Sequence, residues 1–507
     1  MNHRMTTLAV LAATTILAGA ARAAPPPPCF AGDTADDARI AACTAELQAM
    51  KGRKNAPNLA PAYNNRGLAR MHKDDVDGAI DDFTQSIAAK AENLNAYGNR
   101  GAAYERKGDL KAALADYDQA LRIKGDSLPL LINRGSLRGR TGDLDAALAD
   151  LNKALALAPD SFDALDERSH VRMQQKDYDG AIADDDAALR LKKDARVYFN
   201  RGLAWWRKGA RATAIANFDN AIALQPDMVE AYLARGSVKL DENGGASAIA
   251  DFETVIRLKP DDEGGYGGRG LARYRTEDNE GAIADLTHAI ALKATVPENF
   301  YNRGLTWHRK GDYDKAIADF DEAVKLKPDF VDAIQSRGSS WRKKGDVARA
   351  RADFEQALQI DPKASDAYEG RGLLAMDAKQ WAKGMPDLDQ AIALKGSFIN
   401  FHNRGIARSH LGDNAGAASD FKEALIYKQD AETYLDLGIA LRLRGDSNGA
   451  LAAFNEAIRL RPNYADAYHD RAAIWQARGD FARAFADLEQ EDAIRGVVHK
   501  RKKARKK

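Results

Sequence analysis

The sequence lacks the short motifs by which many enzymes are recognised. It contains no H-E-x-x-H, no pair of histidines four residues apart among its nine histidines, no G-x-S-x-G elbow and no P-loop. Carboxylate pairs are frequent, but they recur at positions set by a repeat, and solvated charge explains them. These absences predict a protein that is not an enzyme and that holds neither a metal nor a cofactor.

Long apolar runs are absent except at the start of the chain. Residues 1–23 combine Arg4, an apolar run from Leu8 to Ala20 and the small-x-small end Ala21-Arg22-Ala23, a pattern typical of a secretory signal peptide with its cleavage site. The run is too short to span a membrane comfortably, and prolines at 25–28 disfavour an internal helix. The sequence therefore predicts export to the periplasm, with secretion as the alternative.

Cysteine is scarce, because Cys29 and Cys43 are the only two in 507 residues. Two such ligands without a nearby histidine disfavour a metal site. An even number in an exported chain favours a disulfide, with two free thiols as the alternative. The bridge would tie the start of the mature chain to Ala38–Leu47, which resembles the second half of a repeat unit. Residues 24–59 are therefore predicted to cap the protein.

Net charge is also low, with a formal value of +1, but the charge is unevenly distributed. Residues 499–507 (HKRKKARKK) contain seven lysines or arginines and are predicted to form a basic disordered tail. Contact with an anionic surface is one function for such a tail, and a purely solubilising end is the alternative. Nucleic acid is the less favoured partner because the chain carries an export signal.

What the sequence has in abundance is one repeated unit, represented by Pro297–Phe330. Apolar residues recur at helical spacing on both sides of Gly311-Asp312, which predicts two helices joined by a turn. The dipeptide Arg303-Gly304 marks the unit and recurs at intervals of 33 or 34 residues, as Arg66-Gly67, Arg100-Gly101, Arg134-Gly135, Arg201-Gly202, Arg235-Gly236, Arg269-Gly270, Arg337-Gly338, Arg371-Gly372 and Arg404-Gly405. With three degenerate copies there are thirteen units within residues 60–498. One hairpin cannot bury its own apolar face, so the units must stack into a solenoid.

These units resemble the tetratricopeptide repeat (TPR) family. With Ala60 as position 1 of the first unit, position 4 is usually aromatic, position 8 is Gly in eleven units, position 20 is Ala, and position 24 is large and apolar. The resemblance implies an all-α fold, an α-α superhelical solenoid of about thirteen helical hairpins. It also implies that positions 2, 5, 9 and 12 of each first helix line the concave face.

An internal pattern accompanies the repeat. The arginine at position 7 is followed sixteen residues later by an aspartate in eleven units, as with Arg303 and Asp319. The unit with Leu437 instead of arginine has Ala453 at the partner position. Because a half-buried charge without its partner is unfavourable, loss of both together predicts an ion pair between the two helices.

Three places depart from the repeat and are candidate hinges or kinks. Asp185 stands where other units have an apolar residue and is predicted to be exposed by a local shift. Gly264–Gly270 is a helix with few side chains, and its formal match to G-x-G-x-x-G carries no weight as a dinucleotide site because no strand precedes it. Pro386 is predicted to interrupt a helix near its start. Drift in a tolerant array is the alternative for all three.

Binding residues follow from the concave positions of units five to eight. Those positions supply a predicted apolar groove for a peptide, made of Phe199, Leu203, Trp206, Leu233, Leu240, Leu271, Tyr274, Tyr301, Leu305 and His308. The alternative is that some of them are core residues. Position 13 supplies a row of basic residues, which suggests an acidic or carboxylate-ended ligand. The alternative is that these cations stabilise the carbonyl end of each first helix. The basic row consists of Arg106, Arg140, Arg207, Arg275, Arg309 and Lys343.

Together these observations predict a non-enzymatic scaffold that binds protein or peptide segments in the cell envelope. The alternative is a targeting or regulatory subunit of a separate envelope enzyme or assembly complex. The sequence does not identify the partner.

Overall fold

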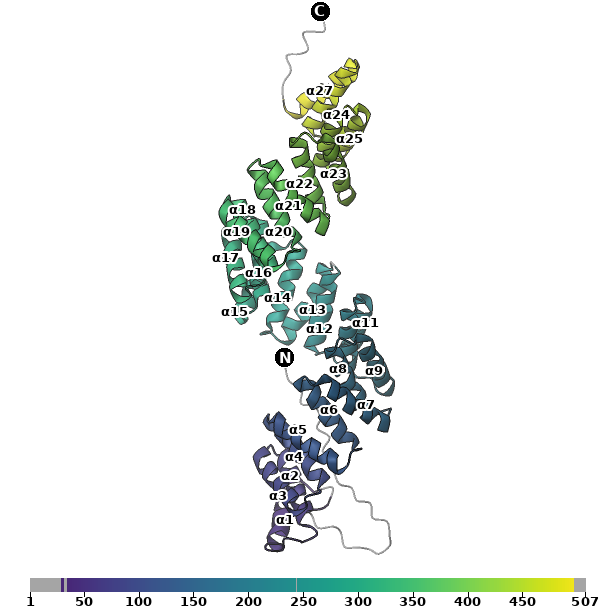
Figure 1. The fold of residues 1–507 in the computed structure, drawn as a ribbon, viewed down its shortest axis with the longest axis vertical. Coiled ribbons are helices and arrows are strands. Elements are labelled where there is room, and N and C mark those ends of the chain that lie inside the picture. The colour runs from purple at the N-terminus through teal and green to yellow at the C-terminus, as the bar shows by residue number, and fades with distance from the viewer. Residues whose placement is uncertain (1–28, 32–33, 243, 497–507) are drawn as a thin grey trace, which may run out of the picture. The chain divides into compact units, whose positions relative to one another are not determined.

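The computed structural model describes residues 29–31, 34–242 and 244–496. The predicted signal peptide (1–23) and basic tail (499–507) lie outside the described residues. The described chain contains 27 α-helices and no β-strand (Figure 1), which confirms the all-α prediction. The helices are α1 (Asp36–Ala49), α2 (Leu59–His72), α3 (Val76–Ala89), α4 (Leu94–Lys107), α5 (Leu110–Ile123), α6 (Leu128–Thr141), α7 (Leu144–Leu157), α8 (Phe162–Gln174), α9 (Tyr178–Leu191), α10 (Ala195–Arg207), α11 (Arg211–Leu224), α12 (Val229–Asp241), α13 (Gly245–Leu258), α14 (Glu263–Arg275), α15 (Asn279–Leu292), α16 (Pro297–Lys310), α17 (Tyr313–Leu326), α18 (Val331–Lys344), α19 (Val347–Ile360), α20 (Ser365–Asp377), α21 (Trp381–Leu394), α22 (Phe398–His410), α23 (Asn414–Tyr427), α24 (Ala431–Leu443), α25 (Ser447–Leu460), α26 (Ala465–Ala477) and α27 (Phe481–Ile494).

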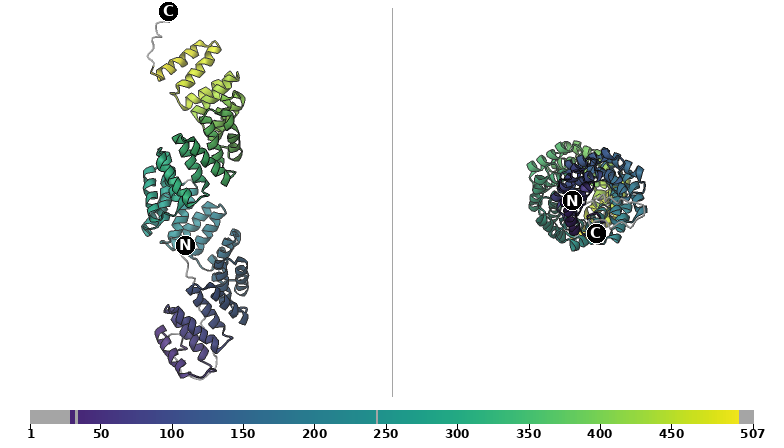
Figure 2. Two further views of the ribbon diagram at one scale, coloured as in Figure 1. Left: turned by 60° about the vertical axis from the view of Figure 1, so that its left-hand side comes forward. Right: turned by 90° about the horizontal axis from the view of Figure 1, so that it is seen from below.

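After α1 the helices pair into thirteen hairpins, from α2–α3 to α26–α27. We call the even-numbered helices the first helices and the odd-numbered ones from α3 onward the second helices. The chain divides into two compact bodies, Met1–Lys259 (the N-terminal body) and Pro260–Lys507 (the C-terminal body). Within each body every second helix packs on its own first helix and on the next first helix, so the hairpins stack in chain order (Figure 2).

The turn inside each hairpin has a local cause, seen clearly between α16 and α17. Gly311 closes α16 with a φ of 80°, a left-handed conformation that glycine adopts without strain. The side chain of Asp312 then accepts a hydrogen bond from the backbone N–H of Lys315 and caps α17. The turn predicted from this dipeptide is therefore confirmed.

The core of most hairpins contains a large apolar side chain lying over a small residue. Phe320 is fully buried, and its ring lies so close to Gly304 that a Cβ there would be 2.7 Å from Cε1. Glycine is needed because the two helices approach this closely. The same contact occurs between Phe421 and Gly405 and between Phe454 and Gly438.

The predicted arginine–aspartate pair is present in all eleven units that carry both residues. In hairpin α16–α17, Arg303 Nε and Nη2 lie 2.9 and 2.7 Å from the two carboxylate oxygens of Asp319. The third nitrogen, Nη1, donates to Thr287 Oγ1 of the preceding second helix at 3.0 Å. The arginine thus joins its own hairpin to the one before it, a second role that the sequence reading missed.

Two predicted departures from the repeat are wrong. Asp185 is not exposed: its side chain is fully buried in α9, because the helix keeps its register between neighbours packed on both sides. Pro386 does not interrupt a helix, since α21 continues through it to Leu394. Near the helix start a proline removes only one backbone hydrogen bond, the one to the carbonyl of Ala382, and the helix tolerates this loss. Whether Gly264–Gly270, within α14, acts as a hinge stays a prediction.

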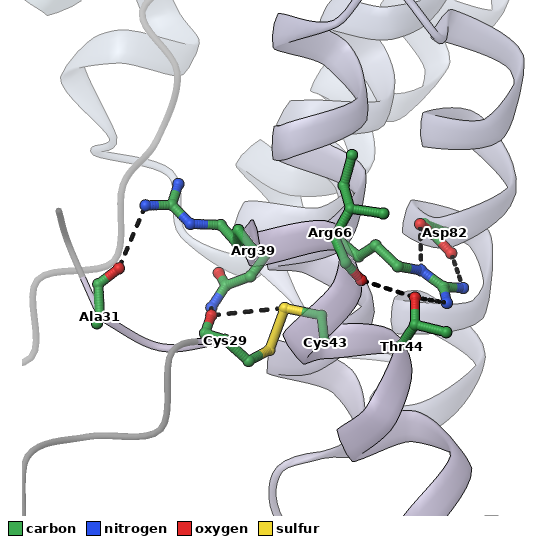
Figure 3. Close-up of a disulfide and its surroundings, with 9 residues drawn as sticks. Cys29, Ala31, Arg39, Cys43, Thr44, Arg66 and Asp82 are labelled. Atoms are coloured by element: carbon green, nitrogen blue, oxygen red, sulfur yellow. Dashed lines mark hydrogen bonds and ion pairs between the residues drawn. A yellow bond between two sulfur atoms is a disulfide. The ribbon is translucent and has the colours of Figure 1, made fainter. Parts of the chain in front are cut away.

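The N-terminal cap is a partial hairpin. Helix α1 packs on α2, and a disulfide joins Cys43 of α1 to Cys29 (Figure 3). Arg66 Nη1 donates to Thr44 Oγ1 at 3.1 Å, just as Arg303 donates to Thr287. Helix α1 therefore takes the place of a second helix, and Cys43 occupies the position that Phe320 holds in a full unit.

Candidate functional site

The first helices form the inner side of the array within each body. Most consecutive first helices within a body contact one another, as α6 does α8 and α18 does α20, whereas the described second helices make no comparable contacts with one another. Helices that approach each other along a stack lie on the inside of its curve. Positions on the exposed side of the first helices are therefore the natural binding surface of each body.

In the N-terminal body this surface carries three large apolar side chains from α10. Phe199, Leu203 and Trp206 are half-buried and pack against a core cluster that contains Phe218 and Val238. The Phe199 and Phe218 ring centroids are 5.8 Å apart. The indole N–H of Trp206 donates to Asp241 at the end of α12, at 3.0 Å.

Two further predicted residues come from α12. Leu233 is half-buried, but Leu240 is only 5% exposed, so it belongs to the core more than to a surface. The N-terminal body thus presents four of its five predicted groove residues with apolar atoms open to solvent, and the core contacts beneath them hold their positions.

In the C-terminal body all five predicted residues, Leu271, Tyr274, Tyr301, Leu305 and His308, are half-buried. The Tyr301 ring lies 5.0 Å from Phe330 and 6.0 Å from Phe320, measured between centroids. Burial, with the nearby Asp332 carboxylate adding, raises the pKa of Tyr301 to about 12. Its hydroxyl therefore stays protonated and available as a hydrogen-bond donor.

His308 lies two turns beyond Tyr301 on the same helix. Its Nδ1 is 2.8 Å from Ser340 Oγ on the next first helix. Burial and the neighbouring Lys343 lower its pKa, so it is uncharged at neutral pH. The part of this surface that α14 and α16 form is therefore apolar with neutral polar groups. A single groove made of all ten residues stays a prediction, because they are divided between the two bodies.

The basic row has contacts within the chain. Arg106 donates to the backbone oxygen of Met71 at 2.7 Å and pairs with Asp74, also at 2.7 Å. Arg140 pairs with Glu105, and Arg309 donates to the backbone oxygen of Tyr274. These three side chains tie the last turn of a first helix to the preceding hairpin. The side chains of Arg207, Arg275 and Lys343 are exposed.

The sequence reading missed four polar residues on the same face. Positions 2 and 5 of α18 and α20 are Asp332, Gln335, Asp366 and Glu369. The sequence contains the signal for them, because positions 2 and 5 are also positions from which the apolar groove was predicted in earlier units. A pattern of apolar anchors does not include these four residues, because their side chains are polar.

The described part of the chain shows no cluster of metal-ligating side chains and no membrane-spanning helix. Among the described residues, no group of three histidine, cysteine or acidic side chains is placed to hold a metal ion. Residues Gly265–Gly270 lie inside α14, so the glycines serve helix packing and not a phosphate-binding turn. None of the described helices combines the length and apolar content that crossing a bilayer requires.

Comparison with known protein families gives matches along most of the chain. Models described as tetratricopeptide repeat match residues 62–127, 100–172, 170–228, 199–263, 297–330 and 337–397. A model described as TPR repeat matches residues 438–479. Together these stretches cover more than half of the sequence. None of the curated proteins compared with the chain matches it.

Several solved structures are similar. The crystal structure of the APC/C hetero-tetramer Cut9-Hcn1 has 13% identity and a TM-score of 0.46, covering 90% of this chain and 96% of that one. Yeast Tom70 has 16% identity and a TM-score of 0.39, covering 86% and 96%. A tetratricopeptide repeat protein from Parabacteroides merdae has 24% identity and a TM-score of 0.41, covering 49% and 99%.

Proposed function

The chain belongs to the tetratricopeptide repeat family of protein-interaction scaffolds, and from this premise we propose that its first helices bind an extended segment of a partner protein. The observation that carries the proposal is that each body has half-exposed aromatic and aliphatic side chains on a first helix, around Trp206 of α10 in the N-terminal body and around Tyr301 of α16 in the C-terminal body. Solvent-exposed apolar side chains grouped on one face mark interaction surfaces.

The fixed geometry of these side chains favours tight binding. Tyr301 is held between Phe320 and Phe330, and Trp206 is held by its bond to Asp241. Side chains that are already ordered lose little rotamer entropy when a ligand binds. Aromatic residues of this kind are the usual hot spots of protein interfaces.

The place of action is part of the proposal. Residues 1–23 have the pattern of an export signal, and a Cys29–Cys43 bridge suits an oxidising compartment. The partner would then be an envelope protein, and the basic tail would meet anionic surfaces there. The proposed binding surface on the first helices does not depend on whether the protein is exported.

The test is photo-crosslinking in cells from a photoreactive phenylalanine placed at Leu203 or Tyr301. Matched controls carry the same group at Asn220 of α11 or Lys325 of α17, which are exposed on second helices. We expect both inner positions to capture a partner that the outer positions do not.

Two other outcomes have clear meanings. Equal capture from inner and outer positions, or none from either, would contradict the proposal. Capture of one enzyme in stoichiometric amounts would favour the alternative role, a targeting or regulatory subunit of that enzyme.

A further inference from the structure

A cleft with a volume of about 440 Å³ lies in the C-terminal body, between the starts of α18 and α20. Asp332 and Gln335 of α18 line it together with Asp366 of α20. Lys363, from the loop before α20, and Lys395, which follows α21, complete its edge. The cleft borders the surface that contains Tyr301. Tyr301, Gln335 and Glu369 all occupy position 5 of their units, in three successive first helices.

Gln335 is an unusual residue to find in this place. It is only 8% exposed, yet its side-chain amide forms no hydrogen bond with any described residue. Its amide atoms are not among the fully buried polar atoms that lack a partner, so they remain open to the cleft. A ligand that enters the cleft can therefore form a hydrogen bond with this amide.

The carboxylates of the cleft are also available. Asp332 and Asp366 are exposed and form no ion pair or side-chain hydrogen bond within the described chain. Asp361 differs, since its carboxylate accepts the backbone N–H of Lys363 at 2.9 Å. Arg342 of α18 donates two hydrogen bonds to Asp377. The helix-borne acids therefore lack a fixed counter-ion.

Neighbouring groups report a negative potential at this place. Burial, with repulsion from Asp366 adding, raises the pKa of Glu369 to about 7. The carboxylates of Asp332 and Asp366 act in the same direction on Tyr301. Arg342 and Lys395 act against the rise in the pKa of Glu369. The lining itself carries three aspartates and two lysines, and this excess of negative charge favours a cationic ligand.

We propose that this cleft receives the cationic end of a lysine or arginine side chain of the partner segment. Asp332 and Asp366 would accept hydrogen bonds from the ammonium or guanidinium group, and the carbonyl oxygen of Gln335 would accept another. The inference rests on the proposed function, because the same segment would cover Tyr301. It specifies the partner as an extended segment that carries an apolar residue and a basic residue at a fixed spacing.

The experiment selects twelve-residue peptides from a displayed random library on the purified full chain. The same selection is run on Asp332→Asn/Asp366→Asn and on a control, Asp227→Asn/Asp329→Asn. The control removes two exposed carboxylates outside the cleft, so it changes the net charge equally. Circular dichroism verifies that each variant is folded.

We expect peptides from the wild type and the control to share a lysine or arginine at a fixed distance from an aromatic residue. The cleft variant should lose that preference while still selecting apolar peptides. Replacing the basic residue of a selected peptide by norleucine should weaken binding to the wild type on the order of tenfold, and binding to the cleft variant by about twofold or less.

Gln335→Leu supplies a second variant, because it removes the buried amide without opening a cavity. It should fold as the wild type does, because Gln335 forms no hydrogen bond with a described residue, and it should bind basic peptides more weakly than the wild type does. The cation site would be contradicted if the wild type and the cleft variant selected peptides with equal basic content, or if the selected peptides were enriched in acidic residues. Either result would leave the proposed binding of apolar segments to the first helices unaffected. Selection of no peptides at all would contradict the proposed function itself.

Discussion

Replacing Asp185 by leucine is expected to stabilise hairpin α8–α9 by on the order of 4 kcal/mol at pH 7. Leucine branches at the same carbon as aspartate, although it is larger, and it is the residue that hairpin α6–α7 uses at this position, where Leu151 lies over Gly135. In the wild type Asp185 is fully buried over Ser169, and neither carboxylate oxygen forms a hydrogen bond of normal geometry.

The size of the effect follows from proton linkage. Burial, with Asp166 and Asp184 adding, raises the pKa of Asp185 to about 8, against the opposing influence of Ser169 and of Arg201 on α10. The unfolded carboxyl ionises near 3.8. Below that value both states are protonated and no penalty exists. As pH rises from about 4 to about 8 the folded state must retain a proton that the unfolded state releases, so stability falls across that window and is then constant.

The readout is amide hydrogen exchange in α8 and α9, because a stacked array opens locally and has no single unfolding free energy. After correction for intrinsic rates, the wild type should lose protection in these helices between pH 5 and pH 8, and Asp185→Leu should not. Asp185→Asn is the matched control: it should remove the pH dependence while keeping a buried polar group. Protection in the wild type that does not change with pH would contradict the account.

The second large effect concerns the ion pair between the helices. Arg303→Leu alone should destabilise hairpin α16–α17 by about 3 kcal/mol, because Asp319 would be left buried without its partner. Burial already raises the pKa of Asp319, and Arg303 limits that rise. Adding Asp319→Ala should restore most of the stability, to within about 1 kcal/mol of the wild type.

The chain contains the natural version of this double variant. Hairpin α24–α25 carries Leu437 with Ala453, both buried, where other hairpins carry the pair. Exchange protection of α16 and α17 in the wild type, both single variants and the double variant completes a double-mutant cycle. Additive effects would mean that the two side chains are not coupled, and the repeated pairing would then need another explanation.

The architecture was predictable because it depends on repetition. Thirteen copies of one pattern determine the helices, the turns at residues such as Gly311 and the arginine–aspartate pairs, since each rests on contacts within a unit. The cap was predictable for the same reason: Cys43 falls where Phe320 does. These features follow from the spacing of residues within a unit and from the need of each hairpin to bury its apolar face against the next.

Other features depend on neighbours that the sequence does not place. Asp185 was expected to turn outward because a buried charge is unfavourable, but adjacent hairpins hold its helix in register. The contacts of Arg140 and Arg309 reach into the preceding hairpin, so a count along one unit could not find them. Gln335 was overlooked because its importance lies in a missing partner, which only the packed structure reveals.

The central claim, that the inner side of the first helices binds a protein segment, is tested most directly by hydrogen exchange with and without a bound peptide. The chain is compared free and with a peptide selected as above. The account predicts new protection at amides of first helices, with α16, α18 and α20 among them, and little change in the second helices. Protection confined to the second helices, or to the turns, would contradict it.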